Sequence, residues 1–141
     1  YIGYYNDGWG LYVNGKYFNN NVESSSLGTT YQGDDIIGIY LDCDNNKLYF
    51  SKNGALINST GISITAPGST TSGFYFFGAT EWNSSGNGTF QLNVGNPSFS
   101  VTSSNTDDNG YGNFEYSPNI TGDGAAKKFY ALNTKNLAEF G

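Results

Sequence analysis

The 141-residue chain contains no histidine, no arginine and no methionine, and it has a single cysteine. Without histidine, neither a Ser-His-Asp triad nor an imidazole metal site can be built. The lone thiol of Cys43 cannot form an internal disulfide, and no base partner is present to activate it as a nucleophile. These absences exclude the common forms of nucleophilic catalysis and of histidine-based metal catalysis.

Cationic side chains are scarce as well, and the formal net charge is −6. A nucleic-acid-binding surface needs Lys or Arg at a density that neutralises phosphates, and six lysines cannot supply it. No stretch approaches the length of a membrane span, and no signal-peptide pattern opens the chain. We therefore predict neither nucleic-acid binding nor membrane insertion, and the acidic charge itself indicates only solubility.

Paired carboxylates would be the remaining route to catalysis, because glycosidases use two acids on either side of the bond that they cleave. No glutamate has another acid two residues away, the spacing that would aim both from one strand face. The four glutamates are Glu23, Glu81, Glu115 and Glu139. We predict a protein that is not an enzyme and needs no cofactor.

Two clusters of Asp and Asn offer the oxygen ligands that calcium prefers. One lies within residues 42–46 and the other is Asp107-Asp108-Asn109. The first run is short and lacks a bidentate glutamate at the right distance. Asp and Asn are also the residues that turns favour, so we interpret both clusters as turns and predict no metal site.

Aromatic side chains are abundant instead, with 12 Tyr, 10 Phe and 2 Trp. Each buries a large area, and a chain of this length matches one domain with one core. Gly and Asn accept positive φ angles in tight turns, while Thr, Tyr and Phe favour strands. This composition predicts an all-β fold of many short strands, with little helix.

Apolar residues alternate with a period of two in several segments, as is typical of strands. Leu11–Val13 and Lys16–Phe18 flank Asn14-Gly15, a pair typical of a type I′ hairpin turn. Two alternating runs and their turns in residues 35–54 predict the start of a three-strand meander. Cys43 falls in this pattern, and we interpret it as a small buried hydrophobe.

Two later segments also predict strands. Gly73–Ala79 is nearly all apolar, which predicts a central strand buried on both faces. Thr89–Val94 alternates, which predicts a strand with its apolar residues turned inward. Residues 96–141 contain Asp- and Gly-rich loops and are expected to form a looser C-terminal segment of the same domain.

Three spaced motifs resemble the central signature of the SPRY domain. They are Gly33-Asp34-Asp35-Ile36-Ile37-Gly38, Leu41-Asp42-Cys43-Asp44-Asn45 and Phe50-Ser51-Lys52-Asn53-Gly54. With Gly8-Trp9-Gly10, the similarity covers residues 1 to about 95. It implies a two-sheet antiparallel β-sandwich of the SPRY type, a concanavalin-like jelly roll.

The tail is similar to the closing segment of SPRY modules in large phage proteins, through residues 108–118 and Phe129–Leu137. This resemblance implies a structural or adhesive module of a phage virion protein, in a tail, fibre or surface decoration. Its location would be the virion, and its partners other virion proteins or a host-surface protein or glycan. A homo-oligomer is compatible with this role.

The chain starts without methionine, at Tyr1, in a strand-like run. The SPRY family normally has one or two strands before this point. We therefore expect residues 1–141 to be a single SPRY-like domain that is an excerpt of a longer polypeptide, with the first strand or strands missing. An edge of the sandwich would then be open unless another segment covers it.

SPRY domains bind peptides or other proteins through loops at one end of the sandwich, and exposed aromatic side chains are natural contact residues. Trp82 is the first residue expected in such a site, followed by Trp9, Tyr5 and Tyr111. The alternative for Trp9 is a place in the core, and for Tyr111 packing against a strand. For Trp82 both interpretations stay open.

Two other functions stay open. One is a cellular SPRY adaptor that recognises a short peptide, and the other is a secreted glycan-binding or self-assembling protein. Secretion would make N-glycosylation relevant at four Asn-x-Ser/Thr sites, Asn58, Asn83, Asn87 and Asn119. Such matches arise by chance in a chain rich in Asn, Ser and Thr, and a phage origin would leave them unmodified.

Overall fold

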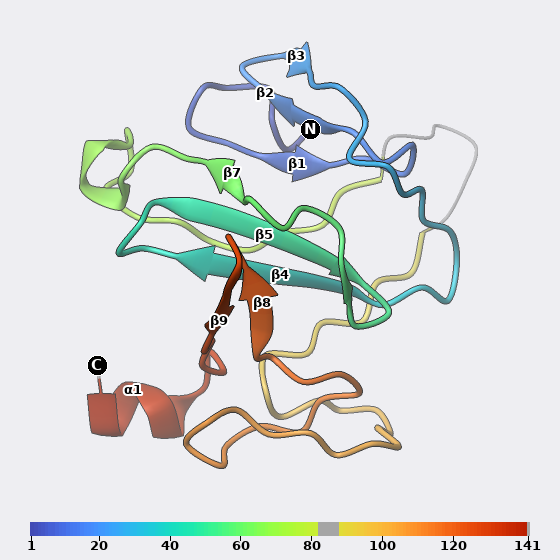
Figure 1. The fold of residues 1–141 in the computed structure, drawn as a ribbon, viewed down its shortest axis with the longest axis vertical. Helices are drawn as coiled ribbons and strands as arrows, with labels where there is room; N and C mark the ends of the chain where they lie inside the picture. Colours follow the sequence, from blue (N-terminus) through green and yellow to red (C-terminus); the bar gives the residue numbers. More distant parts are fainter. Residues whose placement is uncertain (82–87, 141) are drawn as a thin grey trace.

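The computed structural model describes residues 1–81 and 88–140 of the chain. Its regular structure is nearly all β, in antiparallel sheets, which confirms the predicted all-β class. Figure 1 shows a small upper sheet, a longer middle sheet and a hairpin that crosses below it. In the described residues, no helix is long and apolar enough to cross a membrane.

The strands are short except for the central pair. Their bounds are β1 Gly10–Leu11, β2 Tyr17–Asn19, β3 Val22–Glu23, β4 Ile37–Asp42, β5 Lys47–Lys52, β6 Ala55–Leu56, β7 Ile62–Ser63, β8 Ile120–Gly122 and β9 Ala125–Lys127. The upper sheet has the order β1-β2-β3, and the hairpin consists of β8 and β9. In the middle sheet β5 pairs with β4, β6 and β7, so β5 is its central strand.

β5 is buried on both faces, as the alternation in the sequence predicts for neighbouring residues on opposite sides. Leu48 and Phe50 join Ile62 and Ile64 in one core, against which the upper sheet packs. Tyr49 points to the opposite face and is 0 % exposed. The middle sheet is therefore covered from both sides.

The hairpin β8–β9 covers that second face. The Tyr49 hydroxyl donates to Asp123 Oδ2 at 2.5 Å, and Lys127 Nζ donates to Asp42 Oδ2 at 3.0 Å. Burial, together with the Asp123 carboxylate, raises the pKa of Tyr49 to about 12. The Asp123 amide also donates to the Ser59 carbonyl, so backbone and side-chain contacts both join the hairpin to the middle sheet.

The turn between β1 and β2 differs from its prediction. A type I′ turn needs two residues with positive φ, but only Gly15 has one here, at +77°. Residues 12–16 therefore form a wider loop. The required pair of positive φ angles occurs instead between β2 and β3, at Asn20 (53°) and Asn21 (57°).

The predicted central strand at Gly73–Ala79 is wrong. Tyr75 alone turns inward, where its hydroxyl donates to the Thr65 carbonyl at 2.5 Å, and Phe74 and Phe76 are 60 % and 79 % exposed. The central position of the middle sheet belongs to β5, whose edges are paired with β4 and with β6 and β7, and this run pairs with none of the described strands.

The predicted strand at Thr89–Val94 is wrong for the same reason, and its Phe90 and Leu92 are exposed. Cys43 is also exposed rather than buried, because it lies in the turn that follows β4. A short helix that the composition did not predict, α1 Thr134–Phe140, follows Asn133. The Asn133 Oδ1 accepts the Asn136 amide at 3.0 Å, which is a helix N-cap contact.

Replacing Tyr49 by Phe keeps the buried ring and removes its hydrogen bond to Asp123. We expect the free energy of unfolding, measured with denaturant, to fall by about 1–3 kcal/mol. The control Tyr130→Phe, on a side chain 54 % exposed, should change it by less than about 0.5 kcal/mol. Equal stability of the two variants would contradict the proposed role of this contact.

Candidate functional site

The aromatic residues that the sequence suggested for ligand contact do not lie together. Trp82 is outside the described residues, as are Asn83 and Asn87. Trp9 is half-buried and packs against the core above the middle sheet, with its ring centroid 5.9 Å from that of Tyr75. The geometry of Trp9 matches the core alternative.

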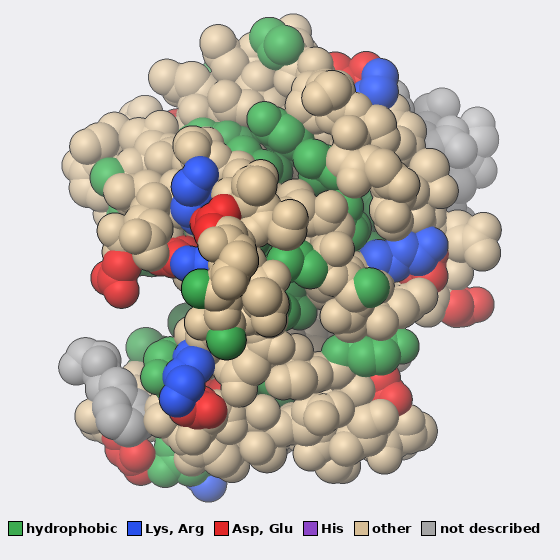
Figure 2. Space-filling view, viewed as in Figure 1, with side chains coloured by type: hydrophobic (Ala, Val, Ile, Leu, Met, Phe, Trp, Pro, Cys, Tyr) green, Lys and Arg blue, Asp and Glu red, His purple; other side chains and the backbone are tan. Residues whose placement is uncertain are grey.

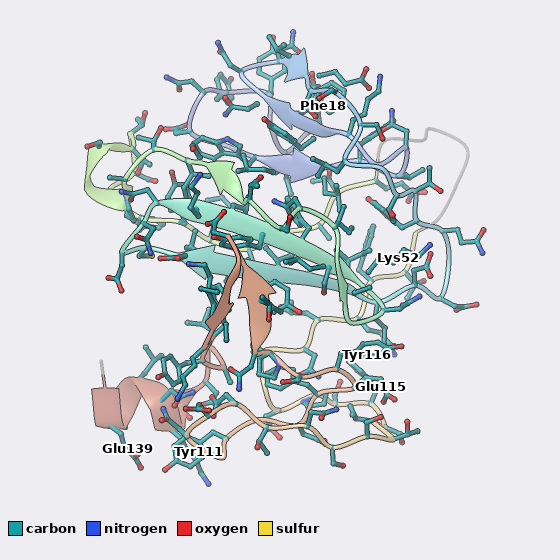
Figure 3. The ribbon with its side chains drawn as sticks, in the orientation of Figure 1. Phe18, Lys52, Tyr111, Glu115, Tyr116 and Glu139 are labelled. Atoms are coloured by element: carbon teal, nitrogen blue, oxygen red, sulfur yellow. The ribbon has the colours of Figure 1, made fainter. Side chains whose placement is uncertain are left out.

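Tyr111 lies at the opposite end of the molecule from Phe18 of the upper sheet (Figure 3). Its hydroxyl donates to Glu139 Oε1 at 2.6 Å, and Lys135 Nζ lies 5.3 Å from the centroid of its ring. Both partners belong to α1. Tyr111 therefore fastens this helix to the C-terminal loops, far from Tyr5.

Tyr5 belongs to a group of aromatic rings on the N-terminal loop. Tyr4 lies between Tyr1 and Tyr5, with ring centroids 5.6 and 5.0 Å away. The ring of Tyr1 also contacts Phe18 of β2 at 5.6 Å. The exposed fractions are 41 % for Tyr1, 48 % for Tyr4 and 71 % for Tyr5. We call Tyr1, Tyr4 and Tyr5 the tyrosine platform.

Of this platform, only Tyr5 was predicted from the sequence. The signal for the other members is the run of tyrosines around Gly3, which strand alternation alone does not separate from core residues. These rings form a surface because Tyr1 packs on Phe18, whose side chain lies on the opposite side of β2 from Tyr17, and Tyr17 packs against the core. That placement depends on contacts between the loop and β2, which the sequence pattern does not encode.

Three consecutive asparagines, Asn19–Asn21, hold the platform loop against the upper sheet. The Asn19 side-chain amide donates two hydrogen bonds of 2.9 Å, and the amides of Asn20 and Asn21 donate at 3.1 and 3.0 Å. All four acceptors are backbone carbonyls of the loop. They belong to Asn6, Gly8, Tyr5 and Gly3, in that order.

Gly3 is required where the loop crosses β2. Its φ is +95°, and a Cβ at this position would lie 2.5 Å from the Phe18 carbonyl oxygen. Any side chain would push the loop away from the strand. The platform therefore stands on a backbone that both hydrogen bonds and close packing hold in place, so its rings are positioned before a ligand binds.

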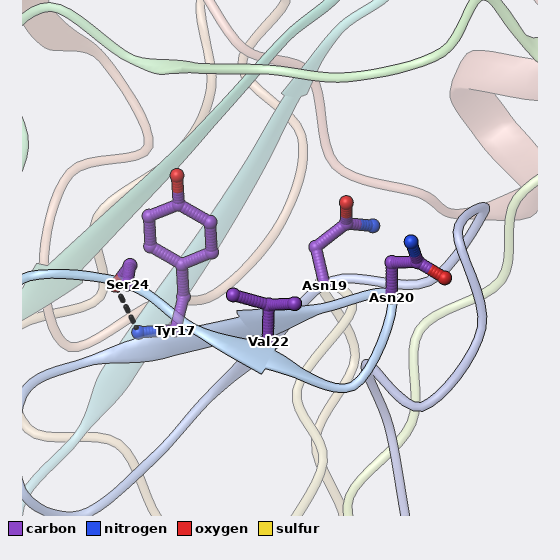
Figure 4. Close-up of a pocket in the computed structure, with 5 residues that line it drawn as sticks. All are labelled: Tyr17, Asn19, Asn20, Val22 and Ser24. Atoms are coloured by element: carbon purple, nitrogen blue, oxygen red, sulfur yellow. Dashed lines mark hydrogen bonds between the residues drawn. The ribbon is translucent and has the colours of Figure 1, made fainter.

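The opposite face of the β2–β3 hairpin has a hollow of about 290 Å³ that is open to solvent (Figure 4). Side chains on β2 alternate, so Phe18 contacts the Tyr1 ring on one side of the strand while Tyr17 and Asn19 line the hollow on the other. Val22, 64 % exposed, also lines the hollow. The lining residues are Tyr17, Asn19, Asn20, Val22 and Ser24.

Charged side chains do not form a patch of one sign near the platform. Residues 1–24 contain three charged side chains, and two of them, Lys16 and Glu23, form an ion pair of 2.7 Å. The third, Asp7, accepts the Thr71 amide at 3.1 Å. Figure 2 shows the same pattern over the visible face, where lysines lie next to acidic residues.

No group of three or more His, Cys, Asp or Glu side chains is placed to hold a metal ion within residues 1–81 and 88–140. In each of the two Asp- and Asn-rich clusters, within residues 42–46 and at 107–109, one aspartate holds local structure together. The Asp42 carboxylate accepts hydrogen bonds from the Asn45 amide and from Lys127 Nζ. Asp107 is 4 % exposed and accepts four hydrogen bonds from the backbone and from Asn136.

The two sequons in the described residues differ in accessibility. Asn58 is 8 % exposed, and its side chain bonds the Phe50 amide at 2.7 Å and the Leu48 carbonyl at 3.0 Å. Its amide nitrogen is therefore already used within the fold. Asn119 is exposed and directly precedes β8.

Asp107 makes the stability of the fold depend on pH. Burial by itself would raise the pKa of Asp107, but hydrogen bonds from Ala131, Asn136, Tyr111 and Asn109 outweigh it and lower the pKa below its usual value. A lowered folded-state pKa means that Asp107 stabilises the fold fully above about pH 4. This stabilisation is lost as the pH falls through the folded-state pKa.

We therefore expect Asp107→Asn to lower the unfolding free energy at pH 7 by about 1–3 kcal/mol, because buried donors lose their acceptor. The variant should also lose less stability than the wild type between about pH 5 and pH 2. Denaturant unfolding across this pH range measures both effects. Asp44→Asn, at an exposed turn, is the control; an acid dependence shared equally by all three proteins would contradict this assignment.

Comparison with known proteins places this arrangement in a family. A family model described as SPRY domain matches residues 1–96, which is more than half of the chain. No curated protein and no solved structure matches it. The matched region contains the tyrosine platform and the two larger sheets, whereas β8, β9 and α1 lie beyond it. SPRY domains are generally non-catalytic modules for protein interaction, and this chain belongs to the SPRY domain family.

Proposed function

We propose that the chain is a non-catalytic structural or adhesive module of a phage virion protein, and that it contacts its partner through the tyrosine platform. The observation that carries this proposal is the set of three exposed rings on a loop fastened to the upper sheet. Aromatic residues dominate binding surfaces because each contributes a large contact area.

The composition of the platform supports this role. Tyr and Asn are the residues that binding loops of antibodies favour, since Tyr offers a large and rigid area and Asn offers adaptable hydrogen bonds. Here the tyrosines stand beside Asn6 and Asn21, which are both exposed. A loop that is already held in place pays little entropy when a partner binds.

The titratable groups support a non-catalytic role. Catalytic sites gather groups with perturbed pKa values in one cleft. In this chain the pKa of Glu115 is lowered to about 2 by hydrogen bonds from Thr102 and Ser103, and that of Tyr49 is raised by burial and Asp123. Each shift arises from a contact that holds the fold together, and the two groups lie in different layers.

The virion role is supported by the likeness of Phe129–Leu137 to the closing stretch of SPRY modules in phage proteins. In the structure this stretch passes from the Asp107 network into α1. Within a virion protein, the partner is another virion protein or a ligand on the host surface. A homo-oligomeric assembly is compatible with this proposal.

Binding to intact bacteria tests the adhesive role. We expect the fluorescently labelled chain to bind cells of at least one strain in a bacterial panel, as measured by flow cytometry. The double variant Tyr4→Ser/Tyr5→Ser should bind about tenfold more weakly, and the control Tyr130→Ser should bind like the wild type. Binding to no strain, or equal binding of all three proteins, would contradict the proposal.

Mass spectrometry of the protein from its natural source tests the virion location. We expect Asn119, the exposed sequon of the described residues, to be unmodified. A glycan on Asn119 would show passage through a secretory route and would favour the secreted alternative.

A further inference from the structure

We infer that the tyrosine platform binds an uncharged carbohydrate chain. This inference rests on the proposed function, in which the same platform is the contact surface. It adds the chemical class of the ligand, for which the ring geometry, the neighbouring amides and the local charges give three independent arguments.

Neighbouring rings of the platform are nearly perpendicular to one another. The Tyr1 and Tyr4 rings are 89° apart, and the Tyr4 and Tyr5 rings are 78° apart. Successive rings therefore point in different directions, and each ring edge packs against the face of its neighbour. Tyr5, at the end of the group and 71 % exposed, offers ring surface to a ligand. The C–H groups on one side of a pyranose ring fit such a surface.

Two side-chain amides border the platform, those of Asn6 and Asn21. A sugar that packs on an aromatic ring keeps its hydroxyl groups at the rim, where they need both donors and acceptors. Asn6 follows Tyr5 directly, and the Asn21 Oδ1 accepts the Tyr1 hydroxyl. Both amides carry N–H donors, and the Asn6 amide also carries a carbonyl acceptor, which suits hydroxyl groups.

Charged side chains near the platform are few. The only lysine in residues 1–24, Lys16, is paired with Glu23, and the Asp7 carboxylate accepts a backbone amide. An anionic glycan or a phosphate would find no unpaired lysine or arginine side chain in this segment, and the net charge of −6 would repel it. A basic peptide would find one carboxylate outside an ion pair in this segment, that of Asp7. An uncharged ligand needs no charged partner.

A proline-rich peptide is another uncharged ligand that aromatic surfaces bind. Such peptides dock as polyproline helices into grooves lined by aromatic rings. The hollow near the platform is on the opposite face of β2, and the platform rings are nearly perpendicular to one another. The geometry therefore favours a carbohydrate over this peptide.

Isothermal titration with defined probes tests the inference. The neutral probes are hexasaccharides of glucose, galactose, mannose and N-acetylglucosamine, the acidic probe is polygalacturonate, and the peptide probe is a proline decamer. We expect at least one neutral hexasaccharide to bind, with an affinity that does not change as NaCl is raised. Salt has no effect because no ion pair contributes to the contact.

Variants locate the binding on the platform. Tyr5→Ala should weaken the binding of that hexasaccharide about tenfold, and Tyr5→Phe should retain it because the ring remains. Tyr130→Ala, on the exposed C-terminal segment, should have no effect. The thermal midpoints of the two Tyr5 variants should match that of the wild type, since this side chain is largely exposed.

Several results would overturn the inference. They are binding of the acidic probe or the proline decamer alone, equal sugar binding by Tyr5→Ala, and no binding by any neutral hexasaccharide. If the labelled chain binds bacterial cells, and this binding depends on Tyr4 and Tyr5, the platform remains the contact surface and only the ligand class is wrong. If cell binding is also absent, the proposed function fails with it.

Discussion

Burial of β5 on both faces is the constraint on which the rest of the structure depends. A strand in this position must supply apolar side chains to two layers at once. Leu48 and Phe50 belong to the core between the middle and upper sheets, and Tyr49 belongs to the core between the middle sheet and the β8–β9 hairpin. The phenol of Tyr49 brings a polar atom into that layer, and its hydrogen bond to Asp123 satisfies it. The hairpin that provides Asp123 lies outside the SPRY match, so a segment beyond the family region completes the core.

Local chemistry made parts of this fold predictable from sequence. The alternation in residues 35–54 correctly predicts β4, β5 and their turns, because each residue obeys the same period of two. The Asn53-Gly54 pair has positive φ angles of 48° and 79°, as a type I′ turn requires. The segment around Phe76 was not predictable in the same way. Its apolar run is typical of a central strand, but β5 already holds the central position of the middle sheet, with β4 on one edge and β6 and β7 on the other.

From the sequence, the kind of candidate site, a contact surface, could be predicted, but most of its members could not. A chain with many aromatic residues and no histidine indicates a contact surface, and Tyr5 was predicted as a member. The grouping of Tyr1 and Tyr4 with Tyr5 depends on the asparagine turn that binds the loop, which only the folded chain brings together. Trp9 and Tyr111 have the same side-chain chemistry as surface residues but pack against the core and α1.

The high asparagine content follows from this architecture. Asn20, Asn21, Asn46 and Asn53 adopt positive φ angles that most residues avoid. Asn19 and Asn58 instead use their side-chain amides to hold neighbouring backbone segments. The same residue type thus closes turns, fastens the platform loop and borders the proposed ligand site.

Native-state hydrogen exchange tests most directly whether β5 unites the layers. The Phe50 amide bonds Asn58 in the sheet core, and the Asp123 amide bonds Ser59 at the junction with the hairpin. If the layers form one cooperative unit, both amides should exchange only through global unfolding, with equal free energies that denaturant lowers in parallel. Exchange of the Asp123 amide at a free energy about 2 kcal/mol or more below that of Phe50 would contradict this account.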